Sequence, residues 1–285
     1  MLCSWVRAAS FCQMHMLGTK LGHGIPKRTM VDKAKTHAQK VAIITGSTEG
    51  IGLAMARRLA QEGAYVVVSS RKKMNVDRAV EELAAENLSV SGVVCHIGKE
   101  EDRQRLVNTA LEKYGGIDYM ISNAAVNPFV GNVLDTTPEV WNKIFEVNVI
   151  STFLMAKLSV PHMQKRGGGS IVFTSSIGAY TPQLTTGAYS VSKTAISCLI
   201  KVLAPALAPM NIRVNALAPG IVRTKFGGVF WQDEEYIKDW CKNNNVCRLG
   251  EPSDFGGIVS FLCSADASYI TGETIVAAGG YSTRL

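Results

Sequence analysis

Tyr189 and Lys193 lie four positions apart in a segment with the pattern of a helix, and Ser176 lies thirteen positions before Tyr189. Residues four apart on a helix share a face, so the phenol and the ammonium group would point into the same space. A phenol has an unperturbed pKa of about 10, and a nearby positive charge lowers it. The spacing therefore predicts a pair able to transfer a proton, although an ordinary solvated helix face shows the same pattern.

A glycine-rich segment far upstream of this pair has the pattern of a nucleotide-binding turn. Thr45–Gly52 has the spacing Gly-x-x-x-Gly-x-Gly and follows the apolar run 40–44. A strand, a glycine-rich turn and a helix together form the entry of a nucleotide-binding unit, where backbone N–H groups receive a pyrophosphate. A glycine cluster can also be a simple loop, but its position between strand and helix favours a phosphate cradle. The residues expected to bind the cofactor here are Gly46, Ser47, Gly50, Ile51 and Gly52.

The elements that must position these residues alternate along the chain. Strands are expected at 41–45, 65–70, 92–95, 119–122, 170–174, 212–217 and 274–277, with helices between them. Alternating strands and helices with Val/Ile-rich strands predict an α/β fold, a single Rossmann-type doubly wound parallel sheet with helices on both faces. Ligands of such sheets bind at the carboxyl ends of the strands. Each of these motifs falls at such an end.

The end of the second strand indicates which nicotinamide cofactor is preferred. An NAD-specific protein places an acid there for the ribose hydroxyls, whereas an Arg accommodates the 2′-phosphate of NADP. This chain has the basic run Ser70-Arg71-Lys72-Lys73 and no acid. We therefore expect NADP(H), held by Arg71 with Ser70, Lys72 and Asn75 as helpers. A solvated basic loop is the alternative.

These motifs together resemble the short-chain dehydrogenase/reductase family, in the subgroup with Thr-Gly-x-x-x-Gly-x-Gly and Tyr-x-x-x-Lys. The resemblance covers residues 40–285, and 122–128 and 268–273 are similar to mammalian members that reduce carbonyls and dicarbonyls. The ending 280–285 is similar to that of one member of this group. The family's ordered landmarks are Ser122-Asn123-Ala124-Ala125, Val147-Asn148-Val149, Ser175-Ser176 and Pro219-Gly220-Ile221-Val222-Arg223-Thr224.

The resemblance implies a role for each matching residue. Tyr189 would deliver a proton to a carbonyl substrate while a nicotinamide gives hydride, and Ser176 would donate a hydrogen bond to the carbonyl oxygen. Lys193 would bind the nicotinamide ribose. Asn148 would hold a water that links Lys193 to solvent. Asn123 would steady the sheet near the cofactor, and 219–224, including Gly220 and Thr224, would line the nicotinamide.

The resemblance also implies a substrate lid at 225–247 and a homo-oligomer, a tetramer or a dimer. Five aromatic residues in the lid suit a small lipophilic carbonyl, or they pack one amphipathic helix. His96 stands where the family has an Asp near the adenine, and Ala125 replaces a Gly. Pro205 should kink or end the helix that begins near Tyr189. The aromatic residues are Phe226, Phe230, Trp231, Tyr236 and Trp240.

Composition bounds the remaining possibilities. The net charge is +7, but residues 1–31 contain four basic residues and no acid, which leaves +3 for the rest. Neither this distribution nor a motif predicts a nucleic-acid partner. Seven cysteines without Cys-x-x-Cys predict no disulfide framework and no metal site. No apolar run is long enough to predict a membrane span.

The chain start differs from the rest in composition. Residues 1–35 are expected to be a leader, and 36–285 the catalytic domain. Residues 1–31 are basic, contain no acid and include apolar residues, which favours a mitochondrial presequence over a tail without an address. The mitochondrial matrix is therefore expected, with cytoplasm, nucleus or peroxisome as alternatives. The expected function is an NADP(H)-dependent carbonyl reductase. The alternative is a weakly active cofactor-binding protein that regulates partners.

Overall fold

The strands of this protein are short apolar runs that pair side by side into one parallel sheet. The computed structural model describes residues 35–232, 234–242 and 244–281. Within them, the sheet order is β3-β2-β1-β4-β5-β6-β7, so the order reverses between β1 and β4. Ligands of open α/β sheets bind at such a reversal. The strands are β1 Val41–Ile44, β2 Tyr65–Ser70, β3 Val90–Val94, β4 Tyr119–Ser122, β5 Gly169–Thr174, β6 Ile212–Pro219 and β7 Thr274–Ala277.

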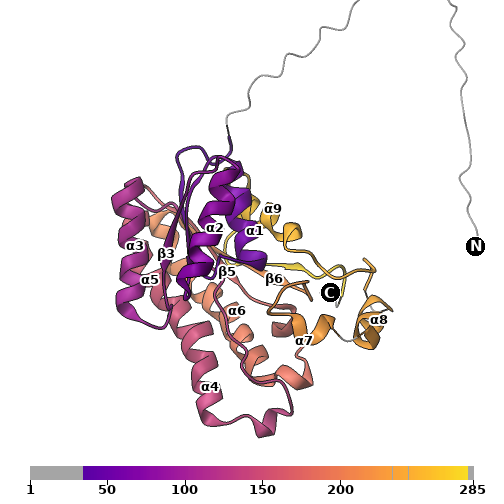
Figure 1. The fold of residues 1–285 in the computed structure, drawn as a ribbon. Helices are drawn as coiled ribbons and strands as arrows, with labels where there is room; N and C mark the ends of the chain where they lie inside the picture. Colours follow the sequence, from indigo (N-terminus) through magenta and orange to yellow (C-terminus); the bar gives the residue numbers. More distant parts are fainter. Residues whose placement is uncertain (1–34, 233, 243, 282–285) are drawn as a thin grey trace, which may run out of the picture. The chain divides into compact units, whose positions relative to one another are not determined.

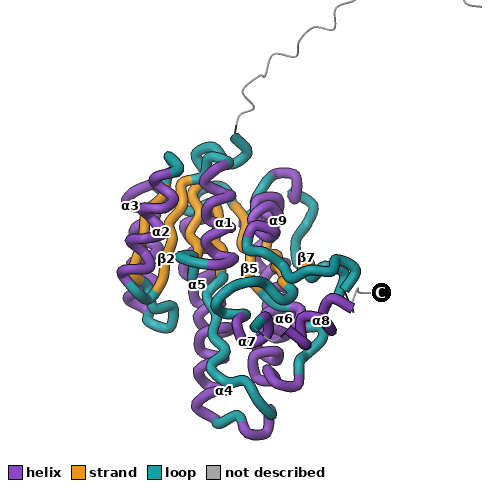
Figure 2. Tube along the Cα trace, turned by 45° about the vertical axis from the view of Figure 1, so that its right-hand side comes forward, coloured by secondary structure: helices purple, strands orange, loops and turns teal. Residues whose placement is uncertain are grey.

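The sheet has a separate apolar core on each face because successive side chains of a strand point to opposite sides. Val41 and Ile43 belong to one core, whereas Ala42 and Ile44 belong to the other. The first core lies under α3 (Glu100–Tyr114), α5 (Ser151–Lys165) and α6 (Gly187–Leu207), and the second under α1, α2 and α9. Figure 2 shows the strands between these helices. The ranges of the second set are Gly50–Gln61, Lys73–Ala85 and Ser253–Cys263.

The predicted fold class is therefore confirmed. The expected strands differ from the observed ones by at most a few residues at their ends, with β6 extending to Pro219. Helix α1 begins at Gly50, directly from the glycine turn. Pro205 lies inside α6, which ends two residues later at Leu207 and continues as a short 3-10 turn. The helix thus ends near the proline, as its missing N–H predicts.

Two helical stretches, Pro138–Lys165 and Leu184–Met210, would be long and apolar enough to cross a membrane by length and composition. The sequence had predicted no such stretch. Both pack on the sheet, the first through α5 on β4 and β5 and the second through α6 on β6. The apolar side chains that face the sheet are accounted for as its cover, while Phe153 of α5 and Val191 and Val202 of α6 remain exposed.

Residues from Lys35 onward form one compact unit, drawn in colour in Figure 1. The predicted leader, 1–35, lies outside the described residues apart from Lys35. Two short helices, α7 (Gly228–Trp231) and α8 (Glu234–Lys242), follow β6 in the expected lid region. Helix α4 (Pro138–Phe145) precedes α5, and Figure 1 shows it extending away from the sheet.

Candidate active site

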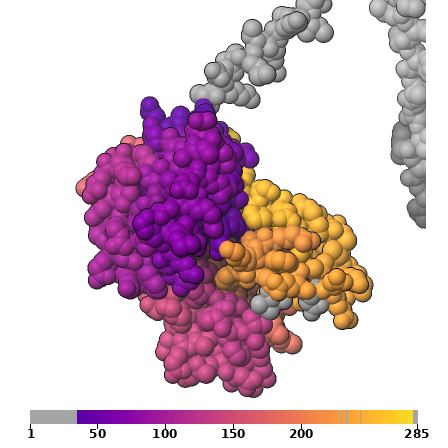
Figure 3. Space-filling view, viewed as in Figure 1, coloured from indigo at the N-terminus to yellow at the C-terminus, as the bar shows by residue number. Residues whose placement is uncertain are grey.

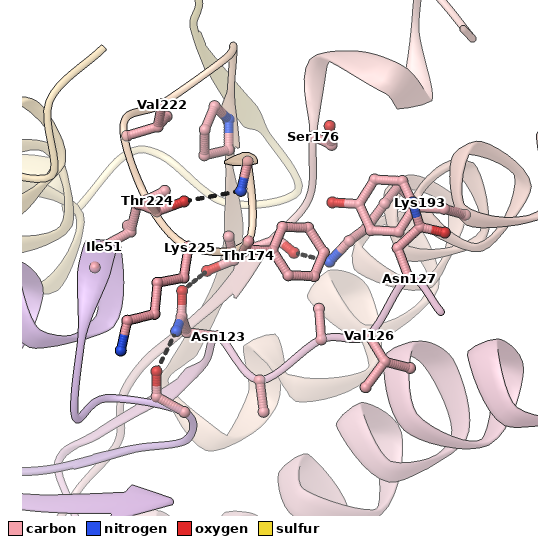
Figure 4. A pocket seen from close by; sticks show the side chains of 18 of the residues that line it. Ile51, Asn123, Val126, Asn127, Thr174, Ser176, Lys193, Val222, Thr224 and Lys225 are labelled. Atoms are coloured by element: carbon pink, nitrogen blue, oxygen red, sulfur yellow. Dashed lines mark hydrogen bonds between the residues drawn. The ribbon is translucent and has the colours of Figure 1, made fainter. Parts of the chain in front are cut away.

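A cavity of about 600 Å³ lies at the carboxyl ends of the strands. It brings together segments that follow β1, β2, β3, β4, β5 and β6, as the switch-point rule predicts. Figure 4 shows part of its lining. Eleven of the residues named individually for catalysis or cofactor binding line it, and five do not. The eleven are Gly46, Gly50, Ile51, Ser70, Arg71, Asn123, Ser176, Tyr189, Lys193, Gly220 and Thr224; the five are Ser47, Gly52, Lys72, Asn75 and Asn148.

The glycine turn has the shape of a phosphate cradle. Gly46 and Gly50 have φ of +59° and +57°, which side chains rarely tolerate. Gly52 does not line the cavity, but a Cβ atom there would collide with the Gly46 carbonyl oxygen and the Asn123 amide. Helix α1 starts with an N-cap, Glu49, whose side chain makes no capping bond. The first N–H groups of α1 therefore remain available for an anion.

Side chains around this turn fix it to the neighbouring strands. Ser47 is fully buried and donates to the Ile44 carbonyl (2.7 Å) while it accepts from the Ser69 N–H (3.0 Å). Asn123 donates to the Gly46 carbonyl at 2.7 Å and accepts from the Thr174 hydroxyl at 3.3 Å. Ser47 therefore joins the ends of β1 and β2. Asn123 joins the glycine turn to β5, which agrees with the steadying role implied for it.

Some of the polar and basic residues after β2 line the cavity, and others do not. Arg71 is exposed and lines the cavity, next to Ser70. Asn75 lies in the first turn of α2 and does not reach the lining. One turn further along α2, Arg78 donates to the Thr48 carbonyl in the glycine turn at 3.5 Å. Sequence reasoning did not identify Arg78, because only the packing of α2 beside the turn brings the two together.

Ser176, Tyr189 and Lys193 meet at one end of the cavity. Ser176 caps a short 3-10 turn after β5, and its hydroxyl accepts from the Gly178 N–H at 3.1 Å. Tyr189 is hydrogen-bonded to Ser176. Lys193 is 3% exposed, and its Nζ donates to the Thr174 carbonyl at 2.7 Å. The Lys193 Nζ also lies 5.5 Å from the centre of the Tyr189 ring. The predicted helix face therefore does bring phenol and ammonium together.

The pKa of the phenol departs from expectation. Burial raises the pKa of Tyr189 to about 12, with the Ser176 hydrogen bond opposing the rise. Burial lowers the pKa of Lys193 to about 8. Lys193 was expected to lower the pKa of Tyr189, whereas in the protein without cofactor the net direction is upward, because desolvation disfavours the phenolate more strongly than the Ser176 hydrogen bond favours it. Tyr189 is consequently held as a neutral phenol, the form that can donate a proton.

Asn148 supports the site from behind the lining. It is buried in a π-helical turn, Glu146–Ile150, between α4 and α5. Its side chain accepts from the Val126 N–H (2.8 Å) and donates to the Val126 carbonyl (3.0 Å) and the Ser192 hydroxyl (3.1 Å). All its side-chain bonds therefore hold the 123–130 loop and α6 in place. Such π turns are frequent at functional sites.

The aromatic lid residues divide between the two roles considered from sequence. Phe226, Phe230, Tyr236 and Trp240 line the cavity, and the rings of Phe226 and Tyr189 are 5.8 Å apart. Trp231 instead donates its indole N–H to the Thr224 carbonyl at 2.8 Å, outside the lining. Figure 3 shows the lid segment against the α1 and α2 segment, around the cavity.

The two departures from the family pattern lie in the lining as well. The His96 ring accepts from the Gly98 N–H at 3.2 Å, and Ala125 lines the cavity beside Ala124. Cys95 and Ile97 flank His96 and also line the cavity. The Cys95 side chain is buried. Within the part of the chain that the structure describes, no His, Cys, Asp and Glu cluster could hold a metal ion.

Comparison with known proteins places this fold and site in a class of oxidoreductases. The family described as "Enoyl-(Acyl carrier protein) reductase" matches residues 46–282. The chain belongs to the short-chain dehydrogenase/reductase family. It is 58% identical to Dehydrogenase/reductase SDR family member 4 of Sus scrofa, over 90% of this chain and 92% of that protein. It is 51% identical to Dehydrogenase/reductase SDR family member 2, mitochondrial, of Homo sapiens, over 90% and 91%.

The ending 280–285 had indicated member 2 in particular, whereas identity is higher with member 4 of Homo sapiens, at 58%, than with member 2. Solved structures agree on the fold. A 7α-hydroxysteroid dehydrogenase complexed with NADH has a TM-score of 0.83 at 31% identity, covering 88% of this chain and 98% of that chain. A gluconate 5-dehydrogenase from Burkholderia cenocepacia, in complex with NADP and tartrate, has 0.83 at 26%, covering 88% and 99%.

Proposed function

We propose that this protein is an NADPH-dependent reductase of small lipophilic ketones, aldehydes or dicarbonyls. The observation that carries the proposal is one cavity with a group of functional residues at each of its two ends. One end has the glycine cradle and the uncapped N-terminus of α1, and the other has the Ser176, Tyr189 and Lys193 groups. The glycine turn fits a dinucleotide because side chains at its glycine positions would meet neighbouring atoms, so the bare backbone is left to approach the phosphates.

When bound, the nicotinamide cofactor supplies the hydride that reaches the carbonyl carbon. The Ser176 hydroxyl donates a hydrogen bond to the carbonyl oxygen and so fixes its position near Tyr189. The Tyr189 hydroxyl donates its proton to that oxygen as negative charge develops. The Lys193 ammonium, held by the Thr174 carbonyl, stabilises the phenolate that remains. Asn148 acts through Val126 and Ser192 by holding the surrounding backbone.

Two observations support NADPH over NADH. Arg71 is exposed at the end of β2, lines the cavity and has no acidic neighbour in sequence. A charge-assisted hydrogen bond to a phosphate contributes about 1.5–3 kcal/mol, which corresponds to about ten-fold or more in affinity. Related structures contain either cofactor, NADH in one and NADP in the other. These two structures therefore do not decide between NADPH and NADH.

The test is to measure both affinities and turnover with a panel of carbonyl substrates. We expect tighter NADPH binding in the wild type, and a loss of about ten-fold for NADPH but not NADH in Arg71→Ala. Equal losses for both cofactors would show that Arg71 only supports the fold. Absence of turnover with every carbonyl, despite NADPH binding, would instead favour a cofactor-binding regulatory protein.

The apolar lining near Tyr189 supports a lipophilic substrate. Phe226, Phe230, Tyr236 and Trp240 line the cavity, and the Phe226 ring lies 5.8 Å from the ring of the proton donor, Tyr189. Two related structures are a steroid dehydrogenase and a gluconate dehydrogenase, whose named substrates differ in polarity. Comparing aryl ketones with short polar ketones of equal reactivity would test this part of the proposal. Higher kcat/KM for the polar ketones would contradict it.

Assembly and location are further parts of the proposal. Apolar side chains remain exposed on the α5 and α6 side, as expected of a homo-oligomer interface. Light scattering at micromolar concentration tests this, and a monomer would contradict it. A mitochondrial address in 1–35 is supported by its composition and by the name of a relative. A reporter fused to 1–35 should enter mitochondria. The exposed apolar residues are Ile150, Phe153, Val191 and Val202.

A further inference from the structure

An ion pair connects the glycine turn to the loop after β6. The Lys225 Nζ lies 2.8 Å from the Glu49 carboxylate, and the two residues are 176 positions apart. Both line the cavity, and their side chains are 78% and 46% exposed. In Figure 4, Lys225 reaches across toward the side on which Ile51 lies. The pair therefore spans the side of the cavity where the phosphates of a dinucleotide would lie.

The loop that carries Lys225 is held firmly close to the glycine turn. A Cβ atom at Gly50 would lie 3.1 Å from the Thr224 methyl group. The Thr224 carbonyl accepts from the Trp231 indole at 2.8 Å, and the Arg223 N–H donates to the Gly250 carbonyl at 2.9 Å. These contacts place Lys225 beside Glu49 even though both side chains are solvated. The pairing is thus a consequence of backbone position.

The charge of Glu49 is unexpected in this position. The turn is built to receive phosphates, through its N–H groups and the start of α1. An unpaired carboxylate there would repel them, since like charges a few ångströms apart oppose each other even at a solvated surface. Arg71 and Arg223 in the cavity lining are basic, as is Arg78, which donates to the Thr48 carbonyl of the turn. Lys225 is the group that neutralises the acid.

We propose that Lys225 is a positioning residue for the cofactor that acts through Glu49. By pairing with the carboxylate, it neutralises the negative charge of Glu49, which would oppose phosphate binding in this turn. The proposal rests on the proposed function. NADPH has one phosphate group more than NADH, so its binding depends more strongly on this neutralisation.

A double-mutant cycle tests the proposal with cofactor affinity as the measured quantity. The proteins are wild type, Lys225→Gln, Glu49→Gln and the double variant, each titrated with NADPH and NADH at low salt. We expect Lys225→Gln to weaken NADPH on the order of 3- to 10-fold and NADH less. Adding Glu49→Gln should return NADPH affinity to within about 2-fold of wild type, since no acid then remains to neutralise.

Two outcomes would overturn the proposal. If Lys225→Gln weakens NADPH equally with and without Glu49→Gln, Lys225 contacts the phosphates itself. If neither change alters any affinity, the pair is an inert surface contact, as many exposed ion pairs are. Lys143→Gln, which breaks the exposed 3.0 Å pair with Glu146 outside the cavity lining, is the matched control and should change nothing.

Thermal unfolding without cofactor checks that all variants fold. A loss of cofactor affinity caused by misfolding would not be reversed by adding Glu49→Gln. The wild-type ratio of NADPH to NADH affinity separately tests the proposed function. A ratio near one would contradict the cofactor preference alone. Rescue of Lys225→Gln by Glu49→Gln would still support the role of Lys225 for whichever cofactor binds.

Discussion

The two ends of the sheet bury ionisable groups in opposite ways. At the amino end, Asp118 is 2% exposed and accepts from the Val41 N–H (2.9 Å), the Lys40 Nζ (3.1 Å) and the Arg166 guanidinium (2.9 Å). At the carboxyl end, Lys193 is 3% exposed and has one carbonyl partner and no acid. The same sheet thus holds a fully partnered charge and an under-partnered one.

A second buried group at the amino end follows the first pattern. The fully buried His37 ring is within hydrogen-bond distance of the Tyr119 hydroxyl (3.1 Å) and the Ser260 hydroxyl (3.0 Å), and Ser260 donates to Glu62. Every polar atom of this cluster therefore has a partner. The carboxyl end includes buried polar atoms without one, the amide oxygen of Asn127 and the hydroxyl oxygen of Ser190.

This difference indicates which end stabilises the fold and which performs chemistry. A buried polar group with partners costs little, whereas one without partners costs about 1–3 kcal/mol. A fold retains such a cost where a ligand or reaction compensates it. We therefore expect substitutions at the amino end to change stability and substitutions at the carboxyl end to change turnover.

The largest effect is expected for Tyr189→Phe, which removes only the hydroxyl group. Carbonyl turnover should fall by about 10²–10⁴-fold, because general acid catalysis contributes that much. NADPH affinity and the unfolding temperature should stay near wild type, since the change removes only the hydroxyl and its hydrogen bond to Ser176. Steady-state kinetics and cofactor titration measure these quantities. Tyr269→Phe, at a fully exposed position, is the control. Near-normal turnover would show that another group donates the proton.

Asp118→Ala should produce the reverse pattern at the amino end. We expect a loss of about 3 kcal/mol in the free energy of unfolding, because the Val41 N–H and two cations lose a buried partner. The kcat of the folded fraction should be unchanged. Lys40→Met, which removes only the half-exposed partner, should cost less than about 1 kcal/mol. Denaturant unfolding measures both. A large fall in kcat without a stability loss would break the comparison.

Local sequence was enough for the parts of this site that depend on spacing. The Tyr189–Lys193 helix face and the glycine turn each lie within one short segment, so strand and helix periodicity placed them correctly. Seven strands were predicted from apolar runs for the same reason. The convergence of the strand ends on one cavity followed from the general rule for parallel sheets.

Contacts between distant segments could not be predicted in this way. The Glu49–Lys225 pair and the Arg78–Thr48 bond depend on how loops and α2 pack. The side-chain bonds of Asn148 to Val126 and Ser192 likewise depend on how the loop after β4 and α6 pack around it. The direction of the Tyr189 pKa depended on burial, which a spacing of four residues does not give. Desolvation is a property of the assembled cavity.

Lys193→Met sharpens the comparison because it should improve the fold while it harms the function. The lowered pKa of Lys193, about 8 against an ordinary 10.5, means that its charged form is disfavoured in the folded protein. Below pH 8 that cost is fully present, and stability rises with pH between 8 and 10.5 as the unfolded chain holds more protons. The variant should therefore gain about 1–2 kcal/mol at pH 7 in the cofactor-free protein.

The gain in Lys193→Met should shrink as the pH rises from 8 toward 10, since the wild-type lysine then loses its charge. Turnover should be lost throughout. Denaturant unfolding of both proteins at pH 7 and 9.5 measures the difference. A destabilised variant at pH 7 would mean that the bond to the Thr174 carbonyl outweighs the burial cost, and that the carboxyl end is not strained by this charge.

The smallest effect concerns His37, because even the well-partnered end holds one group that acid can charge. Burial lowers the pKa of His37 from its ordinary 6.5, against the opposing attraction of Glu62. A histidine with a lowered folded pKa makes stability fall as the pH drops below 6.5, since the unfolded chain then binds more protons. The slope from one group is at most about 1.4 kcal/mol per pH unit.

His37→Gln removes this titration and keeps a polar side chain beside Tyr119 and Ser260. Stability of the variant at pH 7.5 should be within about 1 kcal/mol of wild type. Between pH 6.5 and 5 the wild type should lose stability more steeply than the variant. Glu62, whose pKa is lowered from 4.5 by Ser260 and Arg58, stays ionised in the folded protein there, and the small slope from its unfolded form is common to both proteins. Equal slopes in both proteins would show that His37 takes up its proton without opening the cluster. The groups around it at the amino end would then tolerate its charged form as well as its neutral form.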